Sequence, residues 1–513
     1  MIKKLLDFAK NNPTLFLIYF CVFHFLAVFV LSISKPALST DMVENLYWGS
    51  TWQLGYYKHP PFFAYVSKAW MNLVGGYDNL IFYHALTPLS HVIFFVCIYS
   101  VARRMLSVEK LVLSLIFMDG LLCHYAYSKF NANTALFASY GMIIYSFYHA
   151  VTKESWRKNW YFWILFGIFC ATSMLTKYSS ALLILCFMPL LFTSDLGRKQ
   201  LKNPFLYIGG LVSMALFVPH VIWVFQHKML PFLYLSSKSS PGFSFIEYIG
   251  WILRFALYQI GTCLAFFVAA MQVKKYRKKI DFHDFNTQFL TFVGIAPLAI
   301  TFVMLFCDAK LQAYWVMTFF GLIPAAFLYC YEIKLEKMVT ATKTIIIFFV
   351  FTYVAHILTY IVRPFEPIYE VTKFADDKWD EFAKTVPNLS KPKYIYCYDA
   401  DRICRELHVY SKYQPLVVLH DYTMFGDPNI GRFDVSTWVT KSDLLRESFM
   451  IIADQDIQNV SELNQEEYDL VKGRVCAIYK GEFFEKYRFE FASKFQIRKP
   501  DKEIYRKTFI FCK

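Results

Sequence analysis

Long apolar runs recur along the first two thirds of the chain, and they restrict its possible folds more than any other feature. The first run covers 13–31, and the others lie at 86–101, 111–127, 134–151, 161–176, 180–193, 205–225, 249–272, 287–306, 312–331 and 343–362. About 20 helical residues cross the hydrocarbon core of a membrane. The sequence therefore predicts a polytopic α-helical membrane protein with about eleven spans, and about thirteen as the upper count.

Composition supports this class. Of the 513 residues 57% are hydrophobic and only 18% are charged, which leaves a soluble fold too little polar surface. The net charge of +14 could indicate nucleic acid, but the basic residues gather in alternate loops between the apolar runs. Such a bias marks the cytoplasmic side. We expect a cytoplasmic N-terminus, no nucleic-acid partner, and a location on the outer side for loop 32–85.

The composition changes after Arg363, so we expect a membrane domain at 1–363 and a soluble periplasmic domain at 364–513. Short β-rich runs in the second part predict an α/β or α+β fold; they lie at 394–398, 416–419, 448–452 and 475–479. This part also holds four cysteines, Cys397, Cys404, Cys476 and Cys512. One or two disulfides are possible there, and the pairing stays open.

The stretch at 39–70 in the first outer loop concentrates the groups that could do chemistry. Asp41 and Glu44 are three residues apart, so they share one side of a helix if the segment is helical. A carboxylate at the edge of a membrane cavity can act as a general base on an incoming hydroxyl. The alternative is that both acids cap or solvate a loop helix. Lys58 and His59 precede two prolines, which stiffen the chain and could hold a cation against a phosphate.

Other outer-side ends of the predicted spans carry polar groups as well. These candidate ligands of a sugar or phosphate are Lys129, Asn131, Asn133, Lys177, Tyr178, His227, Lys310 and Tyr314. Simpler roles compete with this interpretation: Asn133 or Thr134 could cap the next helix, and Lys177 could extend to the membrane interface. Together these groups suit a polyprenyl-phosphate sugar donor, because cations neutralise a leaving phosphate while a carboxylate activates the acceptor.

Several motifs carry a resemblance to a known family. The most specific is DMVENLYWGSTWQLGYYKHPPFFAYVSKAW at 41–70, and KFNANTALF, LTKYSSALL, PHVIWVFQHKMLPFLY and KLQAYW follow at 129, 175, 219 and 310. The chain resembles glycosyltransferase family thirty-nine, the PMT_2 or dolichyl-phosphate-mannose-protein mannosyltransferase-like branch of the GT-C superfamily. The lipid A aminoarabinose transferase is a more distant relative. DADRICRELHVY in the C-terminal part is also similar to the outer domain of this family.

The resemblance implies a polyprenyl-phosphate donor, an extracytoplasmic site and inversion at the transferred sugar. It implies that Asp41 is the catalytic aspartate of the first loop, and that Lys58 and His59 belong to the element that holds the donor phosphate. Many relatives carry an aspartate in the second outer loop, where this chain has Asn131 and Asn133. Amides are neither bases nor strong metal ligands, so we expect Asp41 with Glu44 to act without a cofactor. A divalent metal is the less favoured alternative.

With this resemblance, we expect a protein of a bacterial inner membrane whose loop 32–85 and C-terminal domain are periplasmic. We therefore expect an inverting glycosyltransferase that moves a sugar from undecaprenyl phosphate to a periplasmic acceptor. Lipid A, another surface glycan or a protein hydroxyl would be that acceptor. The rival from another class is a transporter or lipid-linked-sugar flippase, which needs ionisable groups deep in several spans. A non-catalytic binding subunit is the third reading, suggested by the missing second aspartate.

Overall fold

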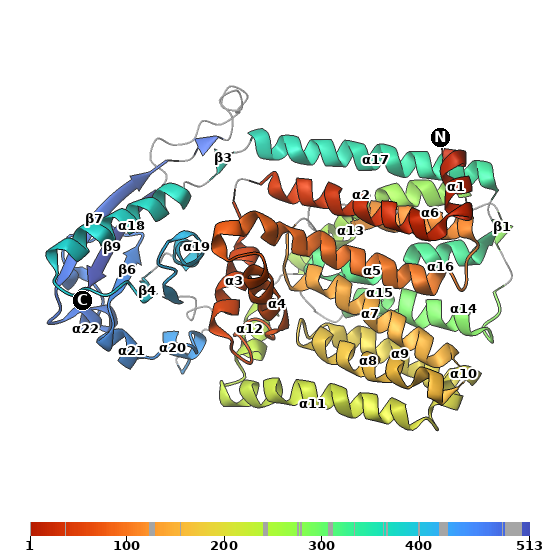
Figure 1. The fold of residues 1–513 in the computed structure, drawn as a ribbon, viewed down its shortest axis with the longest axis horizontal. Helices are drawn as coiled ribbons and strands as arrows, with labels where there is room; N and C mark the ends of the chain where they lie inside the picture. Colours follow the sequence, from red (N-terminus) through yellow and green to blue (C-terminus); the bar gives the residue numbers. More distant parts are fainter. Residues whose placement is uncertain are drawn as a thin grey trace. The chain divides into compact units, whose positions relative to one another are not determined.

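The computed structural model is mostly helical (Figure 1). The residues that it describes are 2–35, 37–122, 129–153, 155–239, 245–273, 276–277, 280–305, 311–332, 334–362, 364–365, 368–398, 401–419, 429–484, 486–487 and 505–513. They fall into two compact units. The first unit contains 1–33, 81–223 and 238–356, and the second contains 34–80, 224–237 and 357–513.

The first unit is a bundle of apolar helices. Its helices and short strands are α1 (Ile2–Asn11), α2 (Pro13–Ile33), α5 (Leu86–Ala102), α6 (Val108–Leu122), α7 (Ala132–Thr152), α8 (Trp156–Met174), α9 (Ser180–Thr193), α10 (Asp195–Gln200), most of α11 (Pro204–Gln226), α13 (Phe245–Val273), β1 (Tyr276–Arg277), α14 (Phe285–Phe289), α15 (Ala296–Leu305), α16 (Ile323–Cys330), β2 (Tyr331–Glu332) and most of α17 (Leu335–Val362). A π-helical turn (Leu290–Ile295) joins α14 to α15, and a 3₁₀ helix (Ala313–Phe320) precedes α16.

Small residues let some of these helices approach closely. Gly167 on α8 faces Gly209 on α11, and a Cβ atom at either position would overlap the backbone of the other helix. Without water to drive helix association inside a membrane, such close backbone packing is a main source of stability. The aromatic rings of Phe147, Trp163 and Phe187 fill the neighbouring space between α7, α8 and α9.

Helices lie at all eleven predicted spans. By length and composition, five helical segments of the described residues could cross a membrane, or six if the bent segment 246–272 is one span. The other predicted spans coincide with helices that are shorter or more polar. For example, α9 has 14 residues, and the run at 312–331 is divided between the 3₁₀ helix and α16.

The second unit is built on a five-stranded sheet with the order β5-β4-β6-β9-β7. Its strands are β4 (Tyr394–Cys397), β5 (Leu416–Val418), β6 (Phe449–Ala453), β7 (Cys476–Phe483) and β9 (Tyr505–Cys512). β4 pairs in parallel with β5 and β6, whereas β9 pairs antiparallel with β6 and β7. The first four strands form at the predicted β-rich runs, and the sheet is mixed.

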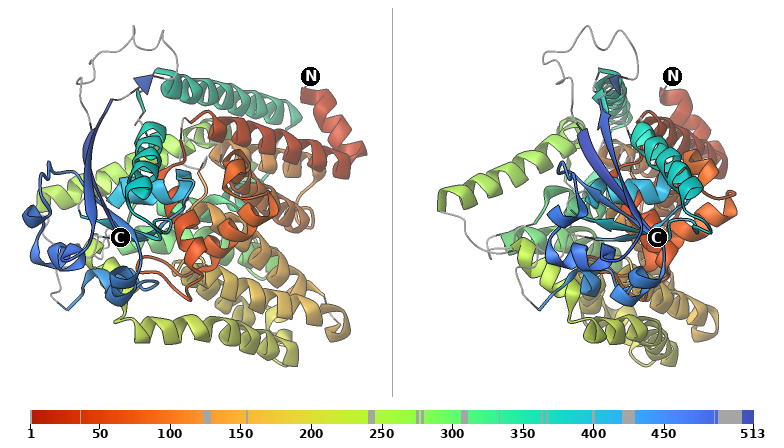
Figure 2. Two further views of the ribbon diagram at one scale, coloured as in Figure 1. Left: turned by 60° about the vertical axis from the view of Figure 1, so that its left-hand side comes forward. Right: turned by 90° about the vertical axis from the view of Figure 1, so that its left-hand side faces the viewer.

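Alternation along the strands gives the sheet two apolar faces. On β9, Phe509 and Phe511 contact Phe374 and Trp379 of α18 (Ile368–Thr385), which covers one face (Figure 2). Ile510 and its neighbours of the same parity pack in the core of the opposite face. Around the sheet lie α19 (Asp401–Tyr410), α20 (Arg432–Val435), α21 (Lys441–Arg446) and α22 (Gln465–Val471), with the short pair β3 (Pro364–Phe365) and β8 (Lys486–Tyr487).

The second unit also includes loop segments that are distant in sequence from the sheet. They contain α3 (Thr40–Thr51), α4 (Phe62–Leu73), the 3₁₀ helix at Tyr77–Ala85 in part, and most of α12 (Leu230–Ser239). The chain thus brings most of the predicted first outer loop into one compact unit with the C-terminal sheet.

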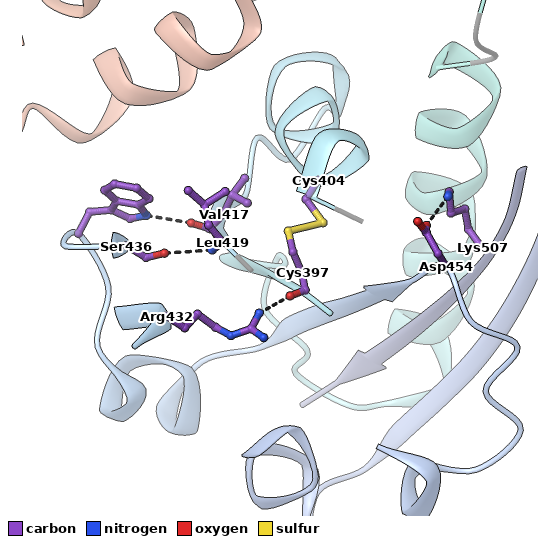
Figure 3. The surroundings of a disulfide bond; sticks show 9 residues. Cys397, Cys404, Val417, Leu419, Arg432, Ser436, Asp454 and Lys507 are labelled. Atoms are coloured by element: carbon purple, nitrogen blue, oxygen red, sulfur yellow. Dashed lines mark hydrogen bonds and ion pairs between the residues drawn. A yellow bond between two sulfur atoms is a disulfide. The ribbon is translucent and has the colours of Figure 1, made fainter. Parts of the chain in front are cut away.

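Two disulfides pair the four cysteines whose connectivity the sequence leaves open. Cys397 at the end of β4 is bonded to Cys404 on α19, and Arg432 donates to the Cys397 carbonyl beside this bond (Figure 3). Cys476 is bonded to Cys512 across the register of β7 and β9. The first bond ties α19 to the sheet, and the second joins two adjacent strands.

We predict that peptide mass spectrometry of the unreduced protein recovers the pairs 397–404 and 476–512. A disulfide restricts the unfolded chain more when it closes a longer loop, and these bonds span 7 and 36 residues. Replacing Cys476 and Cys512 together by alanine should therefore cost about 1 kcal/mol more unfolding free energy than replacing Cys397 and Cys404. Recovery of either pair as free thiols would contradict the assignment.

Candidate active site

The stretch at 39–70 folds as a helix, a turn and a second helix. α3 ends at Trp52, whose backbone is left-handed with φ 50°. α4 begins directly after Pro61, where a proline fits because the first turn of a helix needs no amide donor. Between them, the Tyr56 amide donates to the His59 carbonyl at 3.0 Å, so Lys58 lies in a tight turn.

Close packing fixes this turn against α3. A Cβ atom at Gly49 would lie 2.5 Å from the Ala64 carbonyl oxygen, so only glycine lets α3 and α4 approach in this way. The Tyr56 ring stacks on Trp48 at 5.0 Å between centroids, and its hydroxyl donates to the Trp48 carbonyl at 2.5 Å. The prolines and this aromatic contact therefore hold Lys58 in a defined position.

Glu44 holds two cations with one carboxylate oxygen. The Lys58 ammonium donates to Glu44 Oε1 at 2.8 Å, and the Arg405 guanidinium on α19 donates to the same oxygen at 3.3 Å. The side chains of Glu44, Lys58 and Arg405 are 9%, 17% and 7% exposed. Charges interact strongly where solvent access is limited, so this shared oxygen links α3, the turn at Lys58 and α19.

Lys58 retains hydrogen-bonding capacity. An ammonium has three donors. In the part of the chain that the structure describes, its partners are Glu44 Oε1 and the rings of Tyr57 and Tyr234, at 5.2 and 5.8 Å from the nitrogen. The rings attract the cation through their π faces but take no conventional hydrogen bond. Lys58 can therefore donate to a further anionic oxygen.

Asp41 lies one turn before Glu44 in the first turn of α3, and its side chain is half-buried. The two acids share one side of α3, as the spacing predicts. Glu44 is committed to two cations, whereas the partial exposure of Asp41 suits a group that meets a substrate. Of the two acids, Asp41 is therefore the more accessible to an incoming group.

His408 connects α3 to α19 through a buried polar chain. The ring Nδ1–H donates to the Pro415 carbonyl at 2.9 Å, and Nε2 lies 3.1 Å from the Ser50 hydroxyl. Tyr77 lies 2.9 Å from the same hydroxyl. Burial is the main cause that lowers the pKa of His408 to about 4, and the Lys68 charge lowers it further. His408 is therefore neutral at physiological pH, which leaves Nε2 free to accept.

A second cation lies in the first unit, in the turn between α8 and α9. The Lys177 ammonium donates to Asn133 Oδ1 at 2.6 Å and lies 4.6 Å from the Trp315 ring centroid. Lys177 is buried, and no carboxylate of the described residues contacts it. A buried ammonium with an amide and a ring as partners can accommodate an added anion at low electrostatic cost.

The neighbouring candidates have structural partners. Asn131 caps α7, because its side chain accepts from the amides of Asn133 and Thr134, and Thr134 returns a bond to the Asn131 amide. Capping was the alternative predicted for this segment, although with Asn133 or Thr134 as the cap. The Tyr178 hydroxyl lies 2.7 Å from His220 Nε2.

The remaining candidates are dispersed. His59 packs edge-on to Trp48 and Phe63. His227 lines a hollow in the second unit, Lys129 is half-buried, and Tyr314 is 38% exposed in the first unit. Lys310 lies outside the described residues. Among the residues that the structure describes, no three His, Cys, Asp or Glu side chains are grouped to hold a metal ion.

Sequence reasoning missed the residues that come from distant segments. Arg405 is 361 positions from Glu44. Trp315 and His220 lie in the quoted motifs KLQAYW and PHVIWVFQHKMLPFLY, but the sequence does not predict their contacts with Lys177 and Tyr178. Within DADRICRELHVY, the charged residues beside Cys404 form one signal, since a charged side chain next to a buried apolar face usually needs a partner. That signal does not indicate which residue the partner is.

We predict that Glu44→Ala destabilises the protein by about 3–5 kcal/mol, because it leaves Lys58 and Arg405 side by side without their carboxylate. The thermal unfolding midpoint of the purified full chain measures this. As a control, Glu381→Gln removes the exposed pair of Lys378 and Glu381 and should leave the midpoint nearly unchanged. Equal midpoints for both variants would contradict a structural role for Glu44.

The lowered pKa of His408 predicts a pH dependence. The unfolded chain binds a proton at His408 below about pH 6.5, and the folded chain only near pH 4. The contribution of neutral His408 to the free energy of unfolding is thus fully present above pH 6.5. It is lost as the pH falls from 6.5 to 4, by up to about 3 kcal/mol. Thermal unfolding across this range should show a shallower pH dependence for His408→Gln than for wild type. Parallel curves would exclude His408 as the cause.

Comparisons with known proteins agree with these features. Residues 58–223 match the family model PMT_2, dolichyl-phosphate-mannose-protein mannosyltransferase. No curated protein matches the chain. Among solved structures, ArnT from Cupriavidus metallidurans in the apo state is similar, with a TM-score of 0.59 at 10% identity over 97% of this chain and 98% of that one.

ArnT from the same organism bound to undecaprenyl phosphate matches with a TM-score of 0.56, again at 10% identity over 97% and 98% of the two chains. At this identity, the likeness shows a shared fold. The resemblance predicted from the motifs is thus confirmed: the chain is similar to the PMT_2 family in sequence over 58–223 and to ArnT in fold over nearly its whole length.

Proposed function

We propose that this protein is an inverting membrane glycosyltransferase that moves a sugar from a polyprenyl phosphate to a hydroxyl of a periplasmic acceptor. The observation that carries the proposal is the cation pair Lys58 and Arg405, held on one oxygen of Glu44 beside Asp41. The PMT_2 match and the ArnT fold support it, and undecaprenyl phosphate, bound in the ArnT structure, is the donor lipid that we favour.

The proposed step is a displacement at the anomeric carbon. The acceptor oxygen bonds to that carbon while the bond to the phosphate oxygen breaks, so the configuration inverts. Asp41 accepts the proton of the acceptor hydroxyl as general base. The departing lipid phosphate gains negative charge, and the remaining donors of Lys58 stabilise it.

Glu44 acts in this proposal as a positioning residue. By holding Lys58 and Arg405 on one oxygen, it fixes the cations before the donor arrives. Preorganised charge stabilises a transition state without the cost of reorienting groups during the reaction. Lys177, with Asn133 and Trp315 in the first unit, is a separate candidate site for an anion. Contacts of Lys310 and His59 with the donor phosphate stay predictions.

The two disulfides support an extracytoplasmic location of the second unit. Disulfides persist in the bacterial periplasm and are rare in the cytosol. Both bonds are in the C-terminal sheet region, and the distribution of basic residues predicts the outer side for this region as well. The inner membrane and a periplasmic site follow as part of the proposal.

One observation favours the rival function of a transporter or flippase. In the first unit, His24 on α2 lies 2.5 Å from Asp119 on α6 and 3.0 Å from His91 on α5. Buried ionisable groups within membrane helices commonly mark ion or substrate paths. Purified protein in detergent separates the functions, since an enzyme forms a covalent sugar–acceptor product there, and a transporter has no compartments to work between.

We predict that Asp41→Asn lowers transfer of labelled sugar by about 100- to 10,000-fold, because an amide cannot accept the acceptor proton. Unchanged membrane insertion and unfolding midpoint should accompany the loss. Asp78→Asn is the matched control, since Asp78 is an exposed acid in the same loop and should keep full activity. Activity retained in the Asp41 variant would remove this residue from the mechanism.

A further inference from the structure

A hollow of about 340 Å³ lies in the second unit, and its lining residues do not include Glu44, Lys58 or Arg405. Its walls come from the end of α11 at Gln226 to Lys228 and from α20 and the segment that follows it, at 433–441. These segments are about two hundred positions apart in sequence and belong to the same compact unit. Its volume lies at the lower end of the range for small-ligand pockets, roughly 300–1,000 Å³.

The walls of this hollow are preorganised. The Lys228 ammonium lies 2.8 Å from Asp434 and donates to the Asn429 carbonyl at 2.7 Å. The other oxygen of Asp434 accepts from the Gly431 amide. Lys228 and Met229 both have left-handed backbones, with φ of 52° and 57°. Two successive non-glycine residues in this region cost free energy, and strain of this kind gathers at ligand sites.

The same walls present polar groups to the hollow. The Thr437 hydroxyl is buried and makes no hydrogen bond to any residue that the structure describes. The Gln226 amide and the Lys441 ammonium also line the hollow, and both residues are exposed, so their polar groups can exchange water for a ligand. Phe433 and Val439 add apolar wall between these groups. An unsatisfied buried hydroxyl needs an explanation, and a polar ligand provides one.

This combination fits a sugar ring. A pyranose has an apolar face of C–H groups and a rim of hydroxyls, so it matches an aromatic and aliphatic wall with separated amide, hydroxyl and ammonium groups. A phosphate fits poorly, because the Asp434 carboxylate lines the hollow and already neutralises Lys228. A purely apolar ligand would leave the buried Thr437 hydroxyl unsatisfied.

We infer that this hollow is a carbohydrate subsite that holds a sugar residue of the acceptor. Such a subsite favours a glycan or glycolipid as the acceptor over a bare protein hydroxyl. That the bound sugar belongs to an acceptor rests on the proposed transferase function, whereas sugar binding at the hollow can be measured without any transfer. The hollow also assigns His227 and its neighbours to acceptor recognition, distinct from donor phosphate.

Saturation-transfer NMR with the purified full chain tests the subsite, with methyl glycosides of a hexose, an N-acetylhexosamine and a hexuronate as probes. At least one glycoside should bind saturably, and Thr437→Val should weaken it about three- to tenfold, the effect of losing one hydrogen bond. Thr385→Val is the matched control, because Thr385 is exposed, already donates to Phe382 and should leave binding unchanged.

The proposed donor site, with Asp41, Glu44 and Lys58, provides the second control. Asp41→Asn should keep glycoside binding while transfer is lost, which separates this inference from the proposed function. Glycoside binding in a protein without any transfer would overturn the transferase but not the sugar site. The subsite is overturned if no glycoside binds, if Thr437→Val binds as wild type does, or if inorganic phosphate displaces the glycoside from the hollow.

Discussion

One carboxylate oxygen organises the candidate active site. Glu44 Oε1 receives hydrogen bonds from Lys58 and from Arg405, which belong to a loop turn and to a helix of the C-terminal region. Removing either cation leaves a balanced pair, whereas removing Glu44 leaves two cations in a largely buried site without their shared carboxylate. The arrangement is therefore stable as it stands and still presents ammonium donors. A site with this property can receive a phosphate without first breaking an ion pair.

The packing around α3 makes that arrangement possible. Gly49 lets α4 approach α3, and the stacked rings of Trp48 and Tyr56 fix the turn that carries Lys58. On the other side, the Cys397–Cys404 bond ties α19 to the sheet, and α19 presents Arg405 and His408 to α3. The C-terminal region is thus more than an appended domain, because its helix α19 supplies one of the cations and the histidine that contact α3.

The sequence predicts the helical class and the position of each apolar helix, because membrane spans are set by composition over about 20 residues. It also predicts the loop that carries Asp41, Glu44 and Lys58, since these groups are close in the chain. It cannot predict the contacts of Arg405, Trp315 or the residues opposite His227, because their partners lie more than a hundred positions away. Asn131 illustrates a local limit: an asparagine before a helix suits both a cap and a ligand, and here the cap bonds form.

Binding of undecaprenyl phosphate to the purified protein, measured by native mass spectrometry, tests the central claim most directly. Lys58→Met keeps the Glu44–Arg405 pair and removes one charged donor, so the protein should stay folded while affinity falls about 10- to 100-fold, the effect of losing a charge-assisted hydrogen bond. The exposed control Lys378→Met should bind as wild type does. Equal affinity of wild type and Lys58→Met would contradict the assignment of this cluster to the donor phosphate.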